Sequence, residues 1–143
     1  MKRVAARQKR EVTERARAYC EYCRSPMRFS TNPFSVEHVI PQSLSGKTEL
    51  DNLALSCQGC NNHKYDKITG RDPVSEETVP LYNPRQQQWE DHFAWSQDFT
   101  LVIGLTPIGR AMVEALQLNR DGVVNLRRIL YAAGEHPPAK SNV

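Results

Sequence analysis

The sequence predicts an α+β fold for this chain of 143 residues. Short apolar runs with the composition of strands alternate with segments whose apolar residues recur at helical spacing. Four cysteines form two Cys-x-x-Cys pairs, and nine prolines interrupt the regular elements. These observations indicate one compact, loop-rich domain, or a small module with an appendage, whose modest core needs an additional cross-link.

The first half of the chain predicts a helix followed by the order strand, loop, strand, helix. Residues 8–19 favour a helix because apolar side chains recur there at offsets of four and three. Residues 34–40 and 53–56 read as short strands on either side of a polar loop, and residues 57–68 as an exposed helix. Residues 71–80 contain two prolines and three acidic residues, and we expect a linker there.

The second half predicts a small α+β extension. Residues 89–95 suit a short helix or turn that leads into a strand, and residues 100–105 suit a strand that pairs with it. Two helices are expected, one that starts at Thr106-Pro107 and one that Asp121 caps. The expected organisation is a module at residues 1–70, a linker at 71–80, an extension packed on the module at 81–138, and a disordered tail at 139–143.

Basic residues gather at the N-terminus. Residues 1–28 carry nine Lys or Arg and three Glu, a net charge of +6, whereas the whole chain has a net charge of +3. A concentration of positive charge at one end favours a partner with phosphates, because basic side chains displace counterions from a polyanion. A solvated amphipathic helix would account for the same pattern.

The N-terminal 17 residues contain no apolar segment, so no secretory signal is expected. No run approaches the roughly 18 apolar residues of a membrane span. The sequence therefore predicts a cytoplasmic protein with no membrane association. Thiols stay reduced in that compartment, which favours cysteines that bind a metal over disulfides.

The two cysteine pairs have the spacing of zinc knuckles. Cys20 and Cys23 form one pair, Cys57 and Cys60 form the other, and 33 residues separate them. Two intervening residues let both sulfurs of a pair bind one ion, and two pairs complete a tetrahedron with no position left for water. We expect a structural zinc site, with a redox pair or a chance arrangement as the alternatives.

Three motifs follow one another between and after the knuckles. They are Glu37-His38-Val39-Ile40-Pro41, Asp51-Asn52-Leu53 and Cys60-Asn61-Asn62-His63-Lys64. From about residue 20 to residue 67 the chain resembles the HNH nuclease family, which has the ββα-metal fold and in many members two zinc knuckles around the motif. The resemblance implies a hydrolase of phosphodiester bonds, an endonuclease acting on DNA.

The resemblance also implies the role of each motif residue. His38 would be the general base that activates water, since an imidazole has a free pKa of about 6.5. Glu37 and Asn61 would hold the catalytic divalent ion, Mg²⁺ or Mn²⁺, because oxygen ligands suit hard cations. Glu37 replaces the commoner Asp, and Asn61 stands where many members have a third histidine.

Two further motif residues complete the expected catalytic set. Asn52 would brace the loop that orients the histidine, and Lys64 would contact a phosphate. His63 is not at a motif position. The expected DNA-binding side chains are Lys2, Arg3, Arg7, Lys9, Arg10 and Lys64.

Other interpretations remain for parts of the chain. A non-catalytic zinc-ribbon module that binds nucleic acid would explain the cysteines and the charge, but not the register of the motif residues. A redox protein would leave the second cysteine pair unexplained. The aromatic residues of the extension favour a core, whereas its arginines are candidates for a DNA channel: Arg110, Arg120, Arg127 and Arg128.

Overall fold

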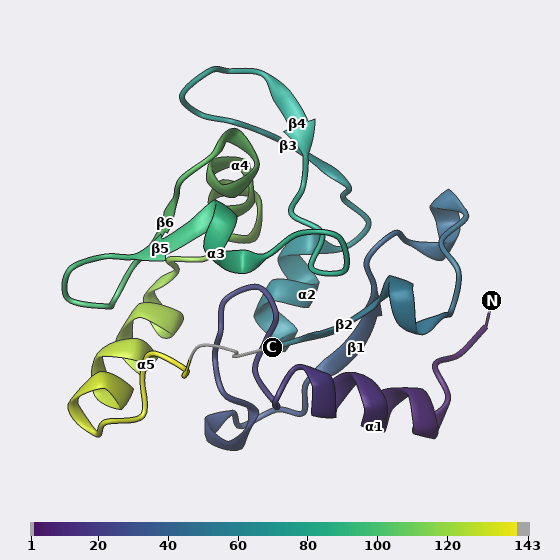
Figure 1. The fold of residues 1–143 in the computed structure, drawn as a ribbon, viewed down its shortest axis with the longest axis horizontal. Helices are drawn as coiled ribbons and strands as arrows, with labels where there is room; N and C mark the ends of the chain where they lie inside the picture. The colour runs from purple at the N-terminus through teal and green to yellow at the C-terminus, as the bar shows by residue number, and fades with distance from the viewer. Residues whose placement is uncertain (1, 140–143) are drawn as a thin grey trace.

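The computed structural model describes residues 2–139, and its first half follows the expected order of elements (Figure 1). The predicted tail therefore lies outside the described residues except for Ala139. The regular elements of this half are α1 Ala6–Arg15, β1 Ser35–His38, β2 Leu53–Ser56 and α2 Gln58–Lys64. β1 and β2 pair in antiparallel register with His38 opposite Leu53. Three 3-10 turns accompany them, at Met27–Phe29, Gln42–Leu44 and Leu50–Asn52.

β2 is buried along its whole length, which explains its continuous apolar character. α1 packs against this sheet through Val12, which forms a small core with Leu53 and Leu55. The helix ends at Arg15, four residues before the predicted end. Residues Arg17 and Ala18 have positive φ angles of 55° and 61°, so the chain there turns out of the helix towards the first cysteine pair.

Residues 71–80 do not form the expected linker. β3, Thr69–Arg71, pairs with β4, Thr78–Pro80, in an antiparallel hairpin. Asp72 stabilises the turn, because its carboxylate accepts hydrogen bonds from the backbone of Val74 and Ser75 and from the Arg110 guanidinium. α2 accordingly ends at Lys64, earlier than the predicted residue 68, to let the chain enter β3.

The second half follows the predicted elements closely. They are α3 Trp89–His92, β5 Phe93–Trp95, β6 Val102–Gly104, α4 Pro107–Leu116 and α5 Asp121–Ala132. β5 and β6 form the expected antiparallel pair. Thr106 caps α4 by accepting a hydrogen bond from the backbone of Gly109. At α5 the capping position belongs to Arg120 rather than to Asp121.

One hydrophobic core joins the two halves. The cysteines and Tyr22 of the first half belong to the same buried cluster as Trp89, Phe93 and Leu116 of the second half. The Trp89 indole also donates a hydrogen bond of 3.1 Å to the backbone oxygen of Tyr22. The extension is therefore packed directly on the knuckles.

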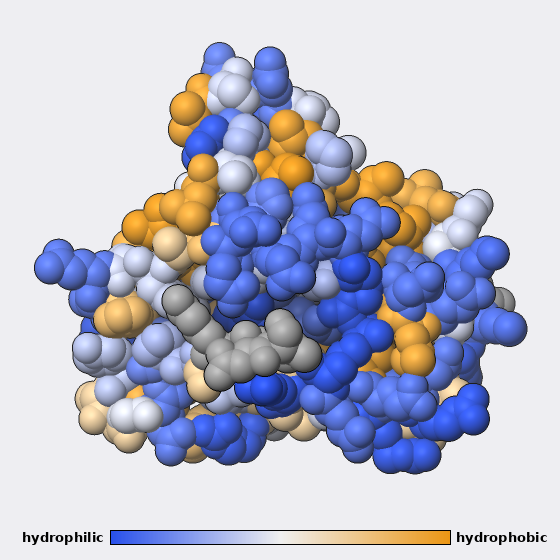
Figure 2. Space-filling view, viewed as in Figure 1, coloured by the Kyte–Doolittle hydropathy of each residue, from blue (hydrophilic) through white to orange (hydrophobic). Residues whose placement is uncertain are grey.

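On the face viewed in Figure 2, hydrophilic residues cover the region over α1, and apolar residues gather in smaller groups elsewhere. Among the described residues, none of the helices combines the length and the apolar character needed to span a membrane.

Candidate active site and metal centre

The four cysteine sulfurs form one cluster in which all lie within 4.8 Å of one another. The Sγ atoms of Cys23 and Cys57 are 3.7 Å apart, far longer than the roughly 2.05 Å of a disulfide. A tetrahedron with bonds of about 2.3 Å has edges of about 3.8 Å, so this spacing suits four thiolates around one zinc ion. The structure confirms the predicted metal-binding cluster, and its sulfur donors fit zinc.

Each knuckle is a tight turn with its own hydrogen bonds. In the first, Cys20 donates from its backbone to Ser25, and Arg24 donates back to Cys20, at 2.9 and 3.0 Å. In the second, Cys57 is the N-terminal capping residue of α2, and its sulfur accepts a bond of 3.4 Å from the backbone of Cys60. The second knuckle therefore fixes the start of the helix that carries Asn61 and Lys64.

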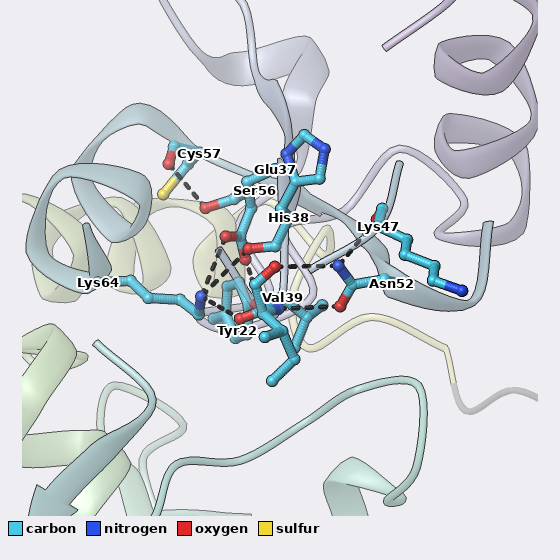
Figure 3. A network of polar contacts seen from close by, with 10 residues as sticks. Tyr22, Glu37, His38, Val39, Lys47, Asn52, Ser56, Cys57 and Lys64 are labelled. Carbon is cyan, nitrogen blue, oxygen red and sulfur yellow. Dashed lines mark hydrogen bonds and ion pairs between the residues drawn. The ribbon is translucent and has the colours of Figure 1, made fainter. Parts of the chain in front are cut away.

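β1 presents Glu37 and His38 to opposite sides, as successive strand residues do. Figure 3 shows the His38 ring pointing away from the pair formed by Glu37 and Lys64. The His38 Nε2 atom lies 2.8 Å from the hydroxyl of Thr48, which also accepts from the Gln42 amide at 2.8 Å. Burial, and then the charge of Lys64, lower the pKa of His38 below its usual value of 6.5. This shift favours the neutral form of the imidazole.

Asn52 uses its whole side-chain amide to hold the backbone that follows His38. Its oxygen accepts from the Ile40 backbone at 2.9 Å, and its nitrogen donates to the carbonyls of Ile40 and Lys47 at 3.0 and 2.9 Å (Figure 3). A Cβ atom at Gly46 would fall 1.7 Å from the Ile40 oxygen, so this loop requires glycine. Asn52 thus has the geometry of a positioning residue.

Lys64 is buried, and the expected phosphate contact needs correction. Its ammonium group donates to the Glu37 carboxylate at 3.1 Å and to the Val39 carbonyl at 2.8 Å (Figure 3). These bonds turn Lys64 inward, where it is 1% exposed, so it cannot meet DNA. It instead fixes β1 to α2.

Glu37 is buried too, and Tyr22 is its second partner. The Tyr22 hydroxyl donates to one carboxylate oxygen, and Lys64 donates to the other. Burial raises the pKa of Glu37, although both partners favour its ionised form. Each carboxylate oxygen has a second lone pair that its protein partner does not use, so a metal ion would bind Glu37 alongside Tyr22 and Lys64. Asn61 lies three residues before Lys64 on α2, hence on the same side of the helix.

The predicted DNA-binding residues of the N-terminus are exposed. They lie next to residues 39–52, the loop between β1 and β2 that we call the His38 loop. The exposed set comprises Lys2, Arg3, Arg7, Lys9 and Arg10. The Gln8 side chain of α1 donates to the Thr48 backbone at 3.0 Å, and Gln42 donates to the backbone of Lys2 at 2.8 Å. These contacts hold the basic segment against the loop that contacts His38.

Some important residues escaped prediction. Tyr22 lies inside a Cys-x-x-Cys pair, where its burial could have been suspected, but nothing in the sequence marks Thr48.

The arginines of the extension are mostly turned inward. Arg110 binds Asp72, and Arg127 is 2% exposed, so neither is available to line a DNA channel.

We predict that Lys64→Met lowers the free energy of unfolding by about 3–5 kcal/mol, because it leaves the buried Glu37 carboxylate without its counter-ion. Urea denaturation at neutral pH measures the change. Lys67→Met, which removes an exposed lysine, should have little effect. A Lys64→Met variant with wild-type stability and weakened DNA binding would contradict this structural role and would indicate that Lys64 contacts phosphate.

Comparison with known proteins agrees with this geometry. Residues 20–67 match the family model described as HNH endonuclease. No curated protein and no solved structure matches the chain. The matched region begins at the first knuckle and includes β1, the His38 loop, β2 and α2. Residues 20–67 therefore carry the match to the HNH endonuclease family, and they contain the four-cysteine metal-binding cluster.

Proposed function

We propose that the protein is a metal-dependent endonuclease that hydrolyses phosphodiester bonds of DNA, with His38 as the general base. One observation carries the proposal: His38 is a half-buried imidazole at the end of β1, within the matched residues 20–67, and its surroundings lower its pKa. Its ring faces away from the buried ion pair, which supports a role as a base because neither Glu37 nor Lys64 occupies the ring nitrogens.

In the proposed reaction, His38 and the residues around it have different roles. His38 accepts the proton of the attacking water and Thr48 holds the ring through Nε2, which leaves Nδ1 without a protein partner among the described residues. Asn52 keeps the backbone after His38 in place. A base held in one orientation contributes more to the rate than a mobile one, because its geometry is set before the reaction.

A divalent ion, Mg²⁺ or Mn²⁺, would supply charge neutralisation at the phosphate and at the leaving oxygen. The oxygen donors of Asn61 and Glu37 suit a hard cation, and Mg²⁺ usually keeps several waters and few protein ligands. Glu37 is already bonded to Tyr22 and Lys64, so Asn61 is the more accessible of the two ligands.

DNA binding is proposed for the exposed basic residues of the N-terminal segment. They follow one another along α1 and the residues before it, and Gln8 and Gln42 hold this segment beside the His38 loop. A phosphate backbone bound there would lie next to the base. A non-catalytic zinc-ribbon module would not need the contacts that Thr48 and Asn52 make around His38.

We predict that His38→Ala lowers the rate of plasmid nicking by roughly two to four orders of magnitude, the usual contribution of a positioned proton acceptor. Supercoiled plasmid with Mg²⁺ gives the measurement. The wild-type rate should rise with pH through an ionisation below 6.5 and then level off, because only neutral His38 accepts a proton and its pKa is lowered.

The matched control is His63→Ala, which removes a histidine of α2 that has no task in the proposed reaction. It should nick plasmid at close to the wild-type rate. A His38→Ala variant as fast as the wild type would disprove the proposed base, and a rate that rises only above pH 8 would assign the proton transfer to another group.

Binding to duplex DNA should depend strongly on salt. Replacing Arg3, Arg7 and Arg10 together by alanine should reduce the slope of log affinity against log salt by about 0.9 for each phosphate that the variant no longer neutralises. Fluorescence anisotropy with a labelled duplex gives the slope. Arg71→Ala, on the distant hairpin, should leave it unchanged. If the triple variant keeps the wild-type slope, the basic segment does not contact the phosphates.

A further inference from the structure

Arg120, at the start of α5, reaches the metal cluster from the extension. Its guanidinium donates to Cys57 Sγ at 3.4 Å and to Cys60 Sγ at 3.6 and 3.7 Å. The same group donates to the carbonyls of Leu116 and Gln117 at 3.3 and 3.1 Å. The end of α4 thus holds the guanidinium in the orientation that points it at the sulfurs.

The charge of the cluster explains why an arginine suits this place. Four thiolates around Zn²⁺ carry a net charge of −2, and three of the four cysteines are buried. Charge in a buried site is costly unless hydrogen bonds and opposite charge offset it. The guanidinium supplies both, because N–H groups of an ionised donor form stronger hydrogen bonds than neutral ones.

The second knuckle has a glycine where Arg120 needs space. A Cβ atom at Gly59 would lie 2.5 Å from an Arg120 nitrogen, so the guanidinium would have to shift from this position. Gly59 lies within α2, where glycine is a poor helix former. Helix formation therefore does not explain this glycine, whereas access of the guanidinium to the sulfurs does.

The first knuckle is held from the same helix. Arg127 of α5 donates to the Cys23 carbonyl at 3.4 Å and to the Leu118 carbonyl at 2.8 Å. Together with the bond from Trp89 to Tyr22, this places residues of the extension on both knuckles. The match to the HNH family ends at residue 67, so these contacts come from outside the matched domain.

We propose that Arg120 is a positioning residue of the zinc site, which offsets the thiolate charge and makes the C-terminal extension responsible for retaining the metal. The inference goes beyond the nuclease function, because it concerns zinc retention and holds whether or not the protein cuts DNA.

The test measures zinc release from the full-length, zinc-loaded protein into excess chromophoric chelator. Arg120→Gln keeps a polar side chain and removes the charge, and it should release zinc about 10-fold faster or more, as expected when a ligand is deprived of its hydrogen-bond partner. Arg120→Lys keeps the charge without the planar fork and should give an intermediate rate. Arg128→Gln, an exposed arginine of the same helix, should match the wild type.

Gly59→Ala tests the same interaction from the other side. The added methyl group displaces the guanidinium without altering Arg120 or any cysteine, and alanine favours the helix. It should speed zinc release in the same direction as Arg120→Gln. In the Arg120→Gln background it should add little, since both changes remove one interaction. If Arg120→Gln fails to fold, the zinc-release rates of Gly59→Ala and Arg120→Lys test the proposal.

Cobalt substitution separates an electrostatic role from simple packing. Hydrogen bonds stabilise thiolate lone pairs, so removing them should move the thiolate-to-cobalt charge-transfer band to lower energy in Arg120→Gln and Gly59→Ala, but not in Arg128→Gln. Wild-type release rates in both Arg120→Gln and Gly59→Ala would overturn the proposal. Faster release with an unmoved band would overturn it as well, because packing alone would then explain the effect.

Discussion

Four cysteine sulfurs gathered within 4.8 Å are the constraint on which the rest of this structure depends. Thiolates held this close would repel one another, so a cation at the centre would stabilise their arrangement. The cysteines come from two turns that are far apart in the sequence, and they lie in the same buried cluster as the aromatic residues of the extension. A protein of this size has a modest core, and a metal bound at the junction would join elements that packing alone would hold weakly.

The same cluster determines the geometry of the candidate active site. The first knuckle contains Tyr22, whose hydroxyl donates to Glu37 in β1. The second starts α2, whose Lys64 donates to the same carboxylate. β1 is therefore fixed from both knuckles through a buried carboxylate, and His38, the next residue, is fixed with it. A structural role for Glu37 and Lys64 thus supports the orientation of His38 on the opposite side of the strand.

Sequence reasoning was most successful where the signal is local. The cysteine spacing, the strand at residues 53–56 and the Thr106-Pro107 helix start each depend on neighbouring residues, and the structure contains all three. It was least successful for features that depend on tertiary contacts. Lys64 was expected to contact phosphate because the sequence does not show that Glu37 lies beside it. Residues 71–80 were expected to be a linker because the bond from Arg110 to Asp72, which holds the hairpin turn, joins residues 38 positions apart. Arg120 has no local signal at all.

The central claim is that the metal unites the matched domain and the extension into one folding unit. Both tryptophans, Trp89 and Trp95, lie in the extension, so their fluorescence reports its folding, while chelator absorbance reports the metal site. Urea unfolding of the zinc-loaded protein followed by both signals tests the claim directly. We predict one shared transition that moves to lower urea when zinc is removed. A tryptophan transition that is separate from zinc loss and unaffected by removal of the metal would contradict it.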